Sequence, residues 1–93
     1  MIISFGDKDT QRLFEDERPK KLPSTILRAA FRKLILIDAA KEINDLRSPP
    51  GNRLEKLSGD LVDFYSIRIN RQWRIIFQWT DEGPENVTIV DYH

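Results

Sequence analysis

The stretch FYSIRINRQWRIIFQWT, residues 64–80, decides the fold, because its side chains alternate with a period of two on both sides of a short polar interruption. Successive side chains of a strand point to opposite faces of a sheet, so this alternation is typical of strands. The letters NRQ predict the turn that joins them. We therefore expect an antiparallel hairpin with one core face and one mixed face. The core face is expected to carry Tyr65, Ile67, Ile69, Trp73, Ile75, Phe77 and Trp79, and the mixed face Phe64, Ser66, Arg68, Arg74, Ile76, Gln78 and Thr80.

The segment NVTIVDYH after the hairpin continues the same pattern to the last residue of the chain. The letters DEGP before it predict a second turn, so a third strand follows. Val87, Ile89 and Asp91 are expected on one side of this strand. Terminal residues fray unless something holds them. We expect this strand to pair between others, which would anchor the backbone almost to His93.

The first half of the chain predicts helices. IISF at residues 2–5 predicts a short strand, and Asp7 can cap a helix that reaches about Asp16. Apolar residues spaced by three and four between 26 and 46 predict an amphipathic helix, either continuous or broken near Asp38. The letters RSPPGN end it, because proline cannot continue a helix. The order predicts an α+β fold, with helices packed on one face of an antiparallel sheet and the other face open to solvent.

Length and composition limit the chemistry. A chain of 93 residues is expected to form one domain over residues 1–93. Cysteine is absent and His93 is the single histidine, which argues against disulfides and against thiolate or histidine metal sites. We therefore expect neither a metal nor a cofactor. The apolar runs are too short for a signal peptide or a membrane span, so we expect a soluble, cytoplasmic protein without a membrane partner.

The charges cancel in number, with fifteen basic and fifteen acidic residues, but they are unevenly distributed. Residues 18–33 carry six bases and no acid, and residues 47–74 carry six bases against three acids. No lysine or arginine follows Arg74. This asymmetry suits a protein that contacts phosphates with one face and something else with another. The alternative is a set of ordinary solvated helix and strand faces.

Two arginines fall on the mixed face of the hairpin. Arg68 and Arg74 lie on neighbouring strands, and a short turn between them would bring their guanidinium groups side by side. Two such groups repel each other unless an anion separates them, and the planar fork of arginine suits phosphate oxygens. The alternative is that each arginine pairs with a strand carboxylate, such as Asp63 or Asp91. Spacing alone leaves both interpretations open.

RNA cleavage without a metal requires a base, a cation and an acid. Glu55 can take the proton of the 2′-hydroxyl, Arg68 and Arg74 can stabilise the charge on phosphorus, and His93 or Tyr92 can protonate the leaving 5′-oxygen. Each of these residues also has a simpler explanation. Glu55 can be an ordinary surface charge, Tyr92 an aromatic residue that packs on the sheet, and His93 part of a frayed chain end. The two tryptophans of the hairpin share the core parity, so we interpret them as core residues.

The runs LRSPPGNRLEKLSGD and YSIRINRQWRIIFQWTDEGPENVTIVDYH closely resemble the HigB toxins of bacterial toxin–antitoxin modules, also called proteic killer proteins, within the RelE/ParE superfamily. The resemblance implies a protein with a microbial-ribonuclease-like fold. Such a protein enters the ribosomal A site and cuts mRNA there without a metal. The resemblance also implies a HigA-like helix-turn-helix antitoxin that represses their shared operon, and so an indirect contact with operator DNA. The catalytic residues of the toxin family match Asp91, Tyr92, His93, Arg74 and Arg68 of this chain.

One position departs from the family pattern. Some HigB toxins carry a catalytic histidine in a sequence like LHPLKGD, where this chain has LEKLSGD, so Glu55 replaces the histidine and Ser58 replaces a lysine. The related YoeB toxins place a glutamate at a similar point as general base. The hypothesis is that Glu55 is the base, His93 or Tyr92 the acid, and Asp91 orients its neighbours. RNA phosphates are expected to be held by Arg53, Lys56 and Arg71.

Two other functions stay open. One is a fold relative with weak or no nuclease activity, which acts through its antitoxin or, like the ParE branch, on another target. The other is a generic basic RNA-binding module, in which Glu55 and His93 could be changed freely. The basic segment 18–33 is a candidate contact for the antitoxin or for ribosomal RNA, and an ordinary solvated helix face is the alternative.

Overall fold

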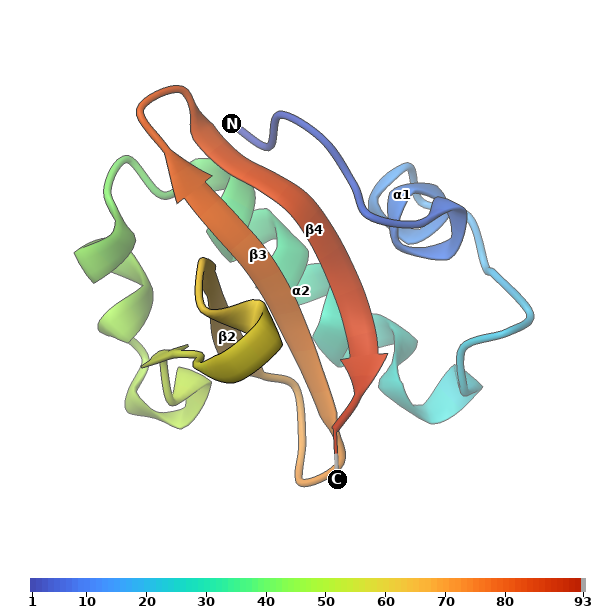
Figure 1. Ribbon diagram of the computed structural model, residues 1–93. Helices are drawn as coiled ribbons and strands as arrows, with labels where there is room; N and C mark the ends of the chain where they lie inside the picture. Colours follow the sequence, from blue (N-terminus) through green and yellow to red (C-terminus); the bar gives the residue numbers. More distant parts are fainter. Residues whose placement is uncertain (93) are drawn as a thin grey trace.

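An antiparallel sheet built from the second half of the chain packs on a long helix from the first half (Figure 1). The computed structural model describes residues 1–92. The sheet has four strands in the order β1-β2-β3-β4, so each strand pairs with its neighbour in the chain. The strands are β1 (Glu55–Lys56), β2 (Phe64–Arg68), β3 (Trp73–Thr80) and β4 (Gly83–Asp91).

The predicted hairpin is formed by β2 and β3. Tyr65 lies opposite Phe77, and Ile67 lies opposite Ile75. Ile67, Ile75 and Phe77 are completely buried, so the face predicted for the core is the core face. The two tryptophans, Trp73 and Trp79, are partly buried and pack against this cluster, as expected from their parity.

The first helix begins at its predicted cap, and the second ends near the predicted break at Asp38. Asp7 caps α1 (Lys8–Phe14), and its side chain accepts a hydrogen bond of 2.8 Å from the backbone N–H of Thr10. The long helix is α2 (Leu27–Ala39), which ends where Ala40 turns to an extended conformation. A short 3₁₀ helix, η2 (Ile43–Arg47), follows. Of the two alternatives for residues 26–46, the broken helix is therefore correct. Three further 3₁₀ turns are η1 (Ser24–Ile26), η3 (Pro50–Asn52) and η4 (Gly59–Leu61).

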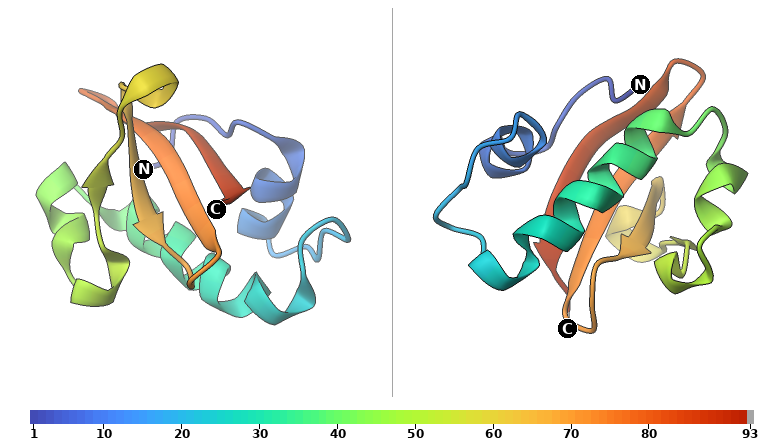
Figure 2. Two further views of the ribbon diagram at one scale, coloured as in Figure 1. Left: turned by 60° about the horizontal axis from the view of Figure 1, so that its bottom comes forward. Right: turned by 180° about the vertical axis from the view of Figure 1, so that it is seen from behind.

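The two helices hold different positions on the sheet. Seen from behind, α2 crosses the core face of the sheet (Figure 2), and it buries Ala30, Leu34 and Ile37 there. The shorter α1 contacts α2 and lies beside β4 (Figure 1). The core face is thus covered mainly by one helix, and the other protects an edge.

The N-terminal segment pairs with β4 only briefly. The strand expected at residues 2–5 is reduced to a single parallel bridge between Phe5 and Val87. Backbone bonds join Gly6 N–H to the Val87 carbonyl and Val87 N–H to the Ser4 carbonyl, at 2.9 and 3.1 Å. A Cβ on Gly6 would lie 2.0 Å from the Thr88 hydroxyl oxygen, so this close approach requires glycine. Because the chain turns into α1 directly after this bridge, the parallel pairing with β4 does not continue.

The last strand is held differently from the expectation. It lies at the edge of the sheet beside β3 and not between two strands. Its outer edge is covered instead, because the Thr10 hydroxyl oxygen of α1 accepts a 2.9 Å hydrogen bond from the N–H of Ile89. At the chain end, Tyr92 N–H donates to the Gln72 carbonyl at 2.7 Å. The backbone is anchored up to Tyr92.

The second face of the sheet is not fully open, which differs from the expectation. Ser66 and Ile76 point to this face but are only 2% and 9% exposed. The loop containing η4 crosses in front of β2 and β3, on the opposite side from α2 (Figures 1 and 2). The part of this face next to the β2–β3 turn stays accessible.

Candidate nucleic-acid interface

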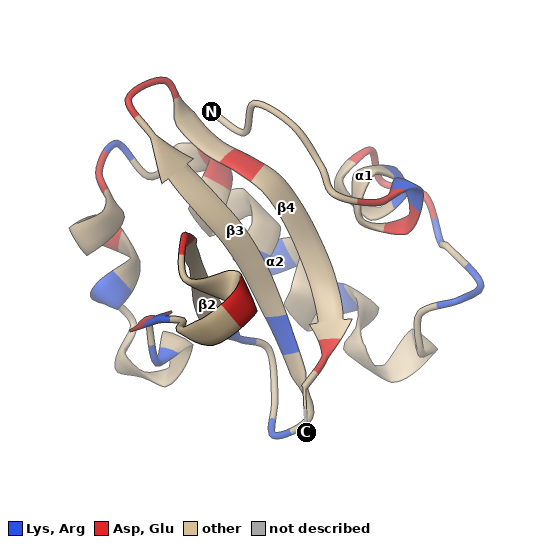
Figure 3. Cartoon of the chain, viewed as in Figure 1, with Lys and Arg blue, Asp and Glu red and all other residues tan. Residues whose placement is uncertain are grey.

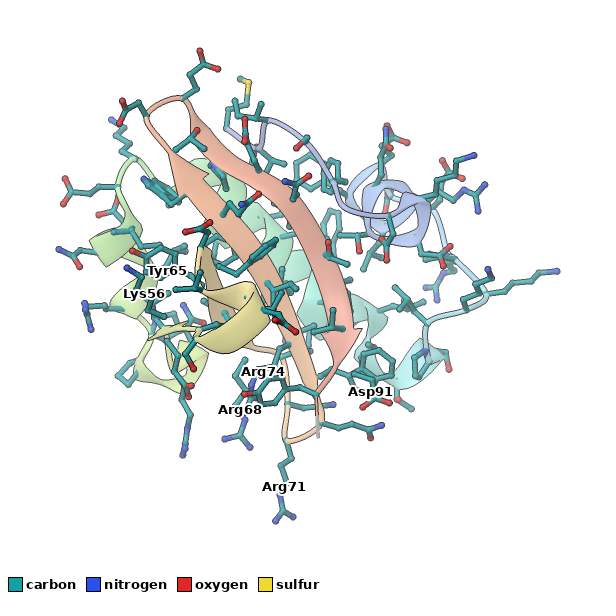
Figure 4. All side chains as sticks on the ribbon, viewed as in Figure 1. Lys56, Tyr65, Arg68, Arg71, Arg74 and Asp91 are labelled. Carbon is teal, nitrogen blue, oxygen red and sulfur yellow. The ribbon has the colours of Figure 1, made fainter. Side chains whose placement is uncertain are left out.

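Arg68 and Arg74 are direct cross-strand partners next to the β2–β3 turn. Opposite residues of an antiparallel pair leave from the same face and lie about 5 Å apart at Cβ. The predicted juxtaposition is therefore confirmed, and Figure 4 shows the two side chains together. Like charges placed directly opposite each other destabilise a sheet. The pair of arginines therefore does not serve the stability of the sheet, and a role in binding an anion would explain it.

Three other arginines act on the charge of Arg68. Partial burial lowers the pKa of Arg68, and the guanidinium groups of Arg53, Arg74 and Arg71 lower it further. The neighbouring guanidinium groups disfavour the charged form of Arg68, and an anion between them would offset their repulsion. Figure 3 shows basic positions gathered where β2 and β3 meet their turn. We call Arg53, Arg68, Arg71 and Arg74 the arginine cluster.

The carboxylate pairing considered as the alternative is not formed by Asp63. Among residues 1–92, Asp63 makes no ion pair with Arg68 or Arg74, whereas Arg12 pairs with Asp9 at 3.7 Å. The carboxylate of Asp91 is engaged by the side-chain amide of Gln72.

Two contacts hold Arg74 in place. Its Nη1 donates a 2.9 Å hydrogen bond to the carbonyl of Asn70. Its guanidinium carbon lies 5.2 Å from the centre of the Tyr92 ring, which is a cation–π geometry. Tyr92 is 42% exposed, so its side chain contacts the arginine and is still partly open to solvent.

Asn70 organises the β2–β3 turn and was missed by the sequence reasoning. Its side-chain oxygen accepts hydrogen bonds from the backbone N–H groups of Gln72 and Trp73, at 2.9 and 2.8 Å. Asparagine commonly bonds its own backbone two residues onward in such turns. The signal in the sequence was an asparagine directly at the end of the alternating segment. It indicates that this turn has a defined shape and that the arginines on both sides are fixed by it.

Glu55 lies on the same face as the arginines. It is opposite Ser66 in the β1–β2 pair, and Ser66 and Arg68 leave β2 from the same side. Glu55 is exposed. Its partner Ser66 lies two residues before Arg68 in β2, so the structure brings the expected base and the expected cations to one face of the sheet.

The other expected RNA contacts divide between two places. Arg53 precedes β1 and adopts a left-handed conformation with φ of 47°, which directs the chain into β1. Arg71 lies at the tip of the β2–β3 turn and points away from the sheet (Figure 4). Lys56 lies opposite Tyr65, so it leaves β1 from the core-side face, away from the arginine cluster.

The adjacent residues Asp91 and Tyr92 point to opposite faces of the sheet. Asp91 is opposite Trp73 and therefore leaves β4 on the core side, whereas Tyr92 contacts Arg74 on the other side. The carboxylate of Asp91 accepts a 3.1 Å hydrogen bond from the side-chain amide of Gln72. Gln72 thus binds both Asp91 and the backbone of Tyr92, a role the sequence reasoning also missed. His93 lies outside the described residues.

A resident metal ion would need several ligands in one place. Among residues 1–92, no three histidine, cysteine, aspartate or glutamate side chains are grouped closely enough to hold one. The groups that the site does offer are guanidinium, carboxylate and phenol.

The fold and this surface define a small α+β protein of the RelE type. The chain belongs to the HigB family, because the model of the "RelE-like toxin of type II toxin-antitoxin system HigB" matches residues 3–93. It is 48% identical to Toxin HigB-1 of Vibrio cholerae serotype O1, over all of this chain and 98% of that protein. It is 32% identical to Endoribonuclease HigB of Proteus vulgaris over the full length of both chains. An uncharacterized protein of Haemophilus influenzae is 43% identical over 89% of this chain.

This membership confirms the resemblance in the sequence. A toxin of a type II module has an antitoxin partner, so one is implied for this chain. No helix of the described chain is long and apolar enough to cross a membrane.

Proposed function

We propose that this HigB toxin is an endoribonuclease that cuts mRNA on the ribosome and thereby inhibits translation. One observation carries the proposal: Arg68 and Arg74 lie side by side on one face of the sheet, and Tyr92 packs against Arg74. The name of the Proteus vulgaris relative, an endoribonuclease, supports the same activity.

The proposed chemistry assigns one role to each group. The 2′-hydroxyl oxygen attacks the adjacent phosphorus while Glu55 accepts its proton. Arg68 and Arg74 stabilise the negative charge that develops on the phosphoryl oxygens, because their forks donate several hydrogen bonds in fixed directions. The bond from phosphorus to the 5′-oxygen breaks, and Tyr92 or His93 protonates the leaving oxygen. The products are a 2′,3′-cyclic phosphate and a 5′-hydroxyl group, and no metal takes part.

Substrate binding is assigned to the remaining charges. Arg53 and Arg71 are close enough to Arg68 to act on its charge, so we assign them to the phosphates that flank the cut. Lys56 leaves from the other face of β1, where it would contact a different part of the RNA. Asp91 acts indirectly in this scheme, since it is bonded to Gln72 and orients the chain end. Binding through phosphates should weaken steeply as the salt concentration rises.

The partners in this proposal are the ribosome with its mRNA and a HigA-like helix-turn-helix antitoxin. Through the antitoxin the toxin would contact operator DNA indirectly. The action lies in the cytoplasm, where ribosomes translate.

The test uses purified toxin with ribosomes that carry an mRNA. Arg68→Ala and Arg74→Ala should each lower the cleavage rate by about 10²–10³-fold, the usual cost of removing one preorganised charge donor. Arg12→Ala is the matched control, because Arg12 lies on α1 and forms only an exposed ion pair. Omitting the ribosome should abolish cleavage. Full cleavage by either cluster variant would refute the proposed site, and full cleavage of free mRNA would refute ribosome dependence.

A second function is favoured by one observation, the exposed Glu55. It stands at the position where the resemblance implies a catalytic histidine in some HigB toxins. If that change has weakened the nuclease, the chain would act through its antitoxin or on a target other than RNA. Growth arrest on expression with all mRNAs intact would establish this second function.

A further inference from the structure

The outward surface of α2 exposes apolar side chains that the core does not use. Ile35 and Leu36 are 44% and 37% exposed, whereas Leu34 and Ile37 beside them are fully buried. Together with Phe31 and Pro49 they line a groove of about 500 Å³ between α2 and the loop that carries Pro49. We call Phe31, Ile35, Leu36 and Pro49 the apolar groove. Exposed aliphatic groups that gather in a groove usually mark a binding site.

The groove has a basic rim. Arg32 and Lys33 line it, and Arg28 lies one helical turn before Arg32 on the same side of α2. Between residues 18 and 37 the sequence contains no acid, and within the described chain none of these three cations forms an ion pair. Burial lowers the pKa of Lys33, and Arg32 lowers it further. The rim is therefore electropositive and without an internal counter-charge.

A second copy of the chain fits this surface poorly. A twofold symmetric contact would place the same patch on both sides. Two basic rims would then share one interface, and like charges at an interface are unfavourable. The groove itself is lined by no acid that a second copy could offer to the rim.

RNA also fits it poorly. Proteins that bind single-stranded RNA present aromatic rings on which bases stack, next to cationic groups. The strongly exposed groups here are aliphatic, and burying aliphatic surface needs an apolar partner. What complements the patch is a protein segment that carries apolar side chains flanked by carboxylates.

We propose that the apolar groove and its basic rim are the docking surface for the antitoxin of this module, through a segment with apolar anchors between acidic residues. The proposal deepens the partner named in the proposed function and does not depend on the nuclease chemistry. The groove is lined by residues of α2 that the core does not bury, and Arg68 and Arg74 leave the sheet from the face opposite the core. Figure 2 shows α2 on one side of the sheet only. An antitoxin bound here would leave Arg68 and Arg74 uncovered.

The test measures the affinity of the full-length toxin for the purified helix-turn-helix protein encoded beside the toxin gene. The double variant Ile35→Glu with Leu36→Glu should weaken binding at least about 10-fold, as expected for central apolar anchors of an interface. Arg32→Glu should weaken antitoxin binding more than Arg32→Ala does. It should also make the affinity for the antitoxin less dependent on salt concentration. The matched control is Leu61→Glu with Val62→Glu, adjacent aliphatic residues that are 37% and 53% exposed on the opposite side of the sheet.

Each outcome decides the proposal. Loss of affinity in the α2 variant, with affinity within about twofold of wild type in the control, supports it. Unchanged affinity in the α2 variant, loss in the control, or no binding by the wild type would overturn it. The same variants are assayed for mRNA cleavage without antitoxin, where the α2 variant should match the wild type. Reduced cleavage with full antitoxin affinity would instead assign the surface to the ribosome. If the wild type cleaves no mRNA, the nuclease proposal fails while the affinity measurement still stands.

Discussion

At the scale of single residues, the contact between Arg74 and Tyr92 joins two roles in one place. The ring lies 5.2 Å from the guanidinium carbon, and such contacts at exposed sites contribute about 0.5–1 kcal/mol. The ring can therefore position the arginine while the hydroxyl group serves as a proton donor. Substitution can separate these two contributions, because phenylalanine keeps the ring and removes only the hydroxyl group.

Tyr92→Phe distinguishes the two candidates for the general acid. If Tyr92 protonates the leaving 5′-oxygen, this variant should lose about 10²–10⁴-fold in cleavage rate, with little change in the affinity for ribosome-bound mRNA. Tyr92→Leu removes the ring as well and should also weaken that affinity. Single-turnover rates and binding measurements check this. Wild-type rates for Tyr92→Phe would assign the acid to His93.

Glu55 can be tested as the general base. Glu55→Gln keeps the size and polarity of the side chain but cannot accept the 2′-hydroxyl proton, so the cleavage rate should fall about 10²–10⁴-fold. Glu55→His introduces the residue that other HigB toxins carry there and should restore much of the rate. Because Glu55 is exposed, neither change should alter thermal stability. A glutamine variant with full activity would show that the base lies elsewhere.

At the scale of elements, the edge strand β4 shows how a chain end is held without a second neighbouring strand. Unpaired strand edges are hazards that proteins cover or block. Here the Thr10 hydroxyl of α1 and the backbone of Ser4 and Gly6 cover the edge. Periodicity predicted the strand, but it could not show which side would be the edge, because that depends on contacts made some 80 residues away along the chain.

Thr10→Val tests this cover. Valine has nearly the shape of threonine but cannot accept the N–H of Ile89, and an unsatisfied buried donor costs about 1–3 kcal/mol. The free energy of unfolding in urea should fall by that amount, and the Ile89 amide should exchange its hydrogen faster. Thr10→Ser keeps the hydroxyl group and is the matched control. Equal stability of the valine and wild-type chains would mean that water or a shifted group satisfies Ile89.

At the scale of the whole molecule, the sheet separates two surfaces. One face carries the arginine cluster next to the chain end, and α2 presents the apolar groove on the other side (Figure 2). Residues far apart in the sequence meet on each surface. Because the described chain end is bonded to the β2–β3 turn, an addition after His93 would protrude beside the arginine cluster.

A tag fused directly to His93 should therefore impair cleavage by crowding the site. The same tag placed before Met1, which is 80% exposed and lies at the other end of the molecule in Figure 1, should leave cleavage unchanged. Both fusions are compared with untagged toxin on ribosome-bound mRNA. Undiminished cleavage by the C-terminal fusion would argue against catalytic groups at the chain end.

The sequence by itself determined the features that act over a few residues. The period of two placed Ile67, Ile75 and Phe77 in the core and put Arg68 and Arg74 on the other face, and Asp7 marked the start of α1. These features follow from backbone geometry and local hydrogen bonds, which neighbouring residues decide.

The place of β4 in the sheet and the coverage of the sheet faces became known only from the folded chain. The tertiary structure showed that η4 covers part of the second face, that β4 is an edge strand, and that Asp91 faces away from Arg74 while Tyr92 contacts it. The physical reason is that these arrangements arise from contacts between distant segments. Their free energy depends on what packs against each element, which no local pattern contains.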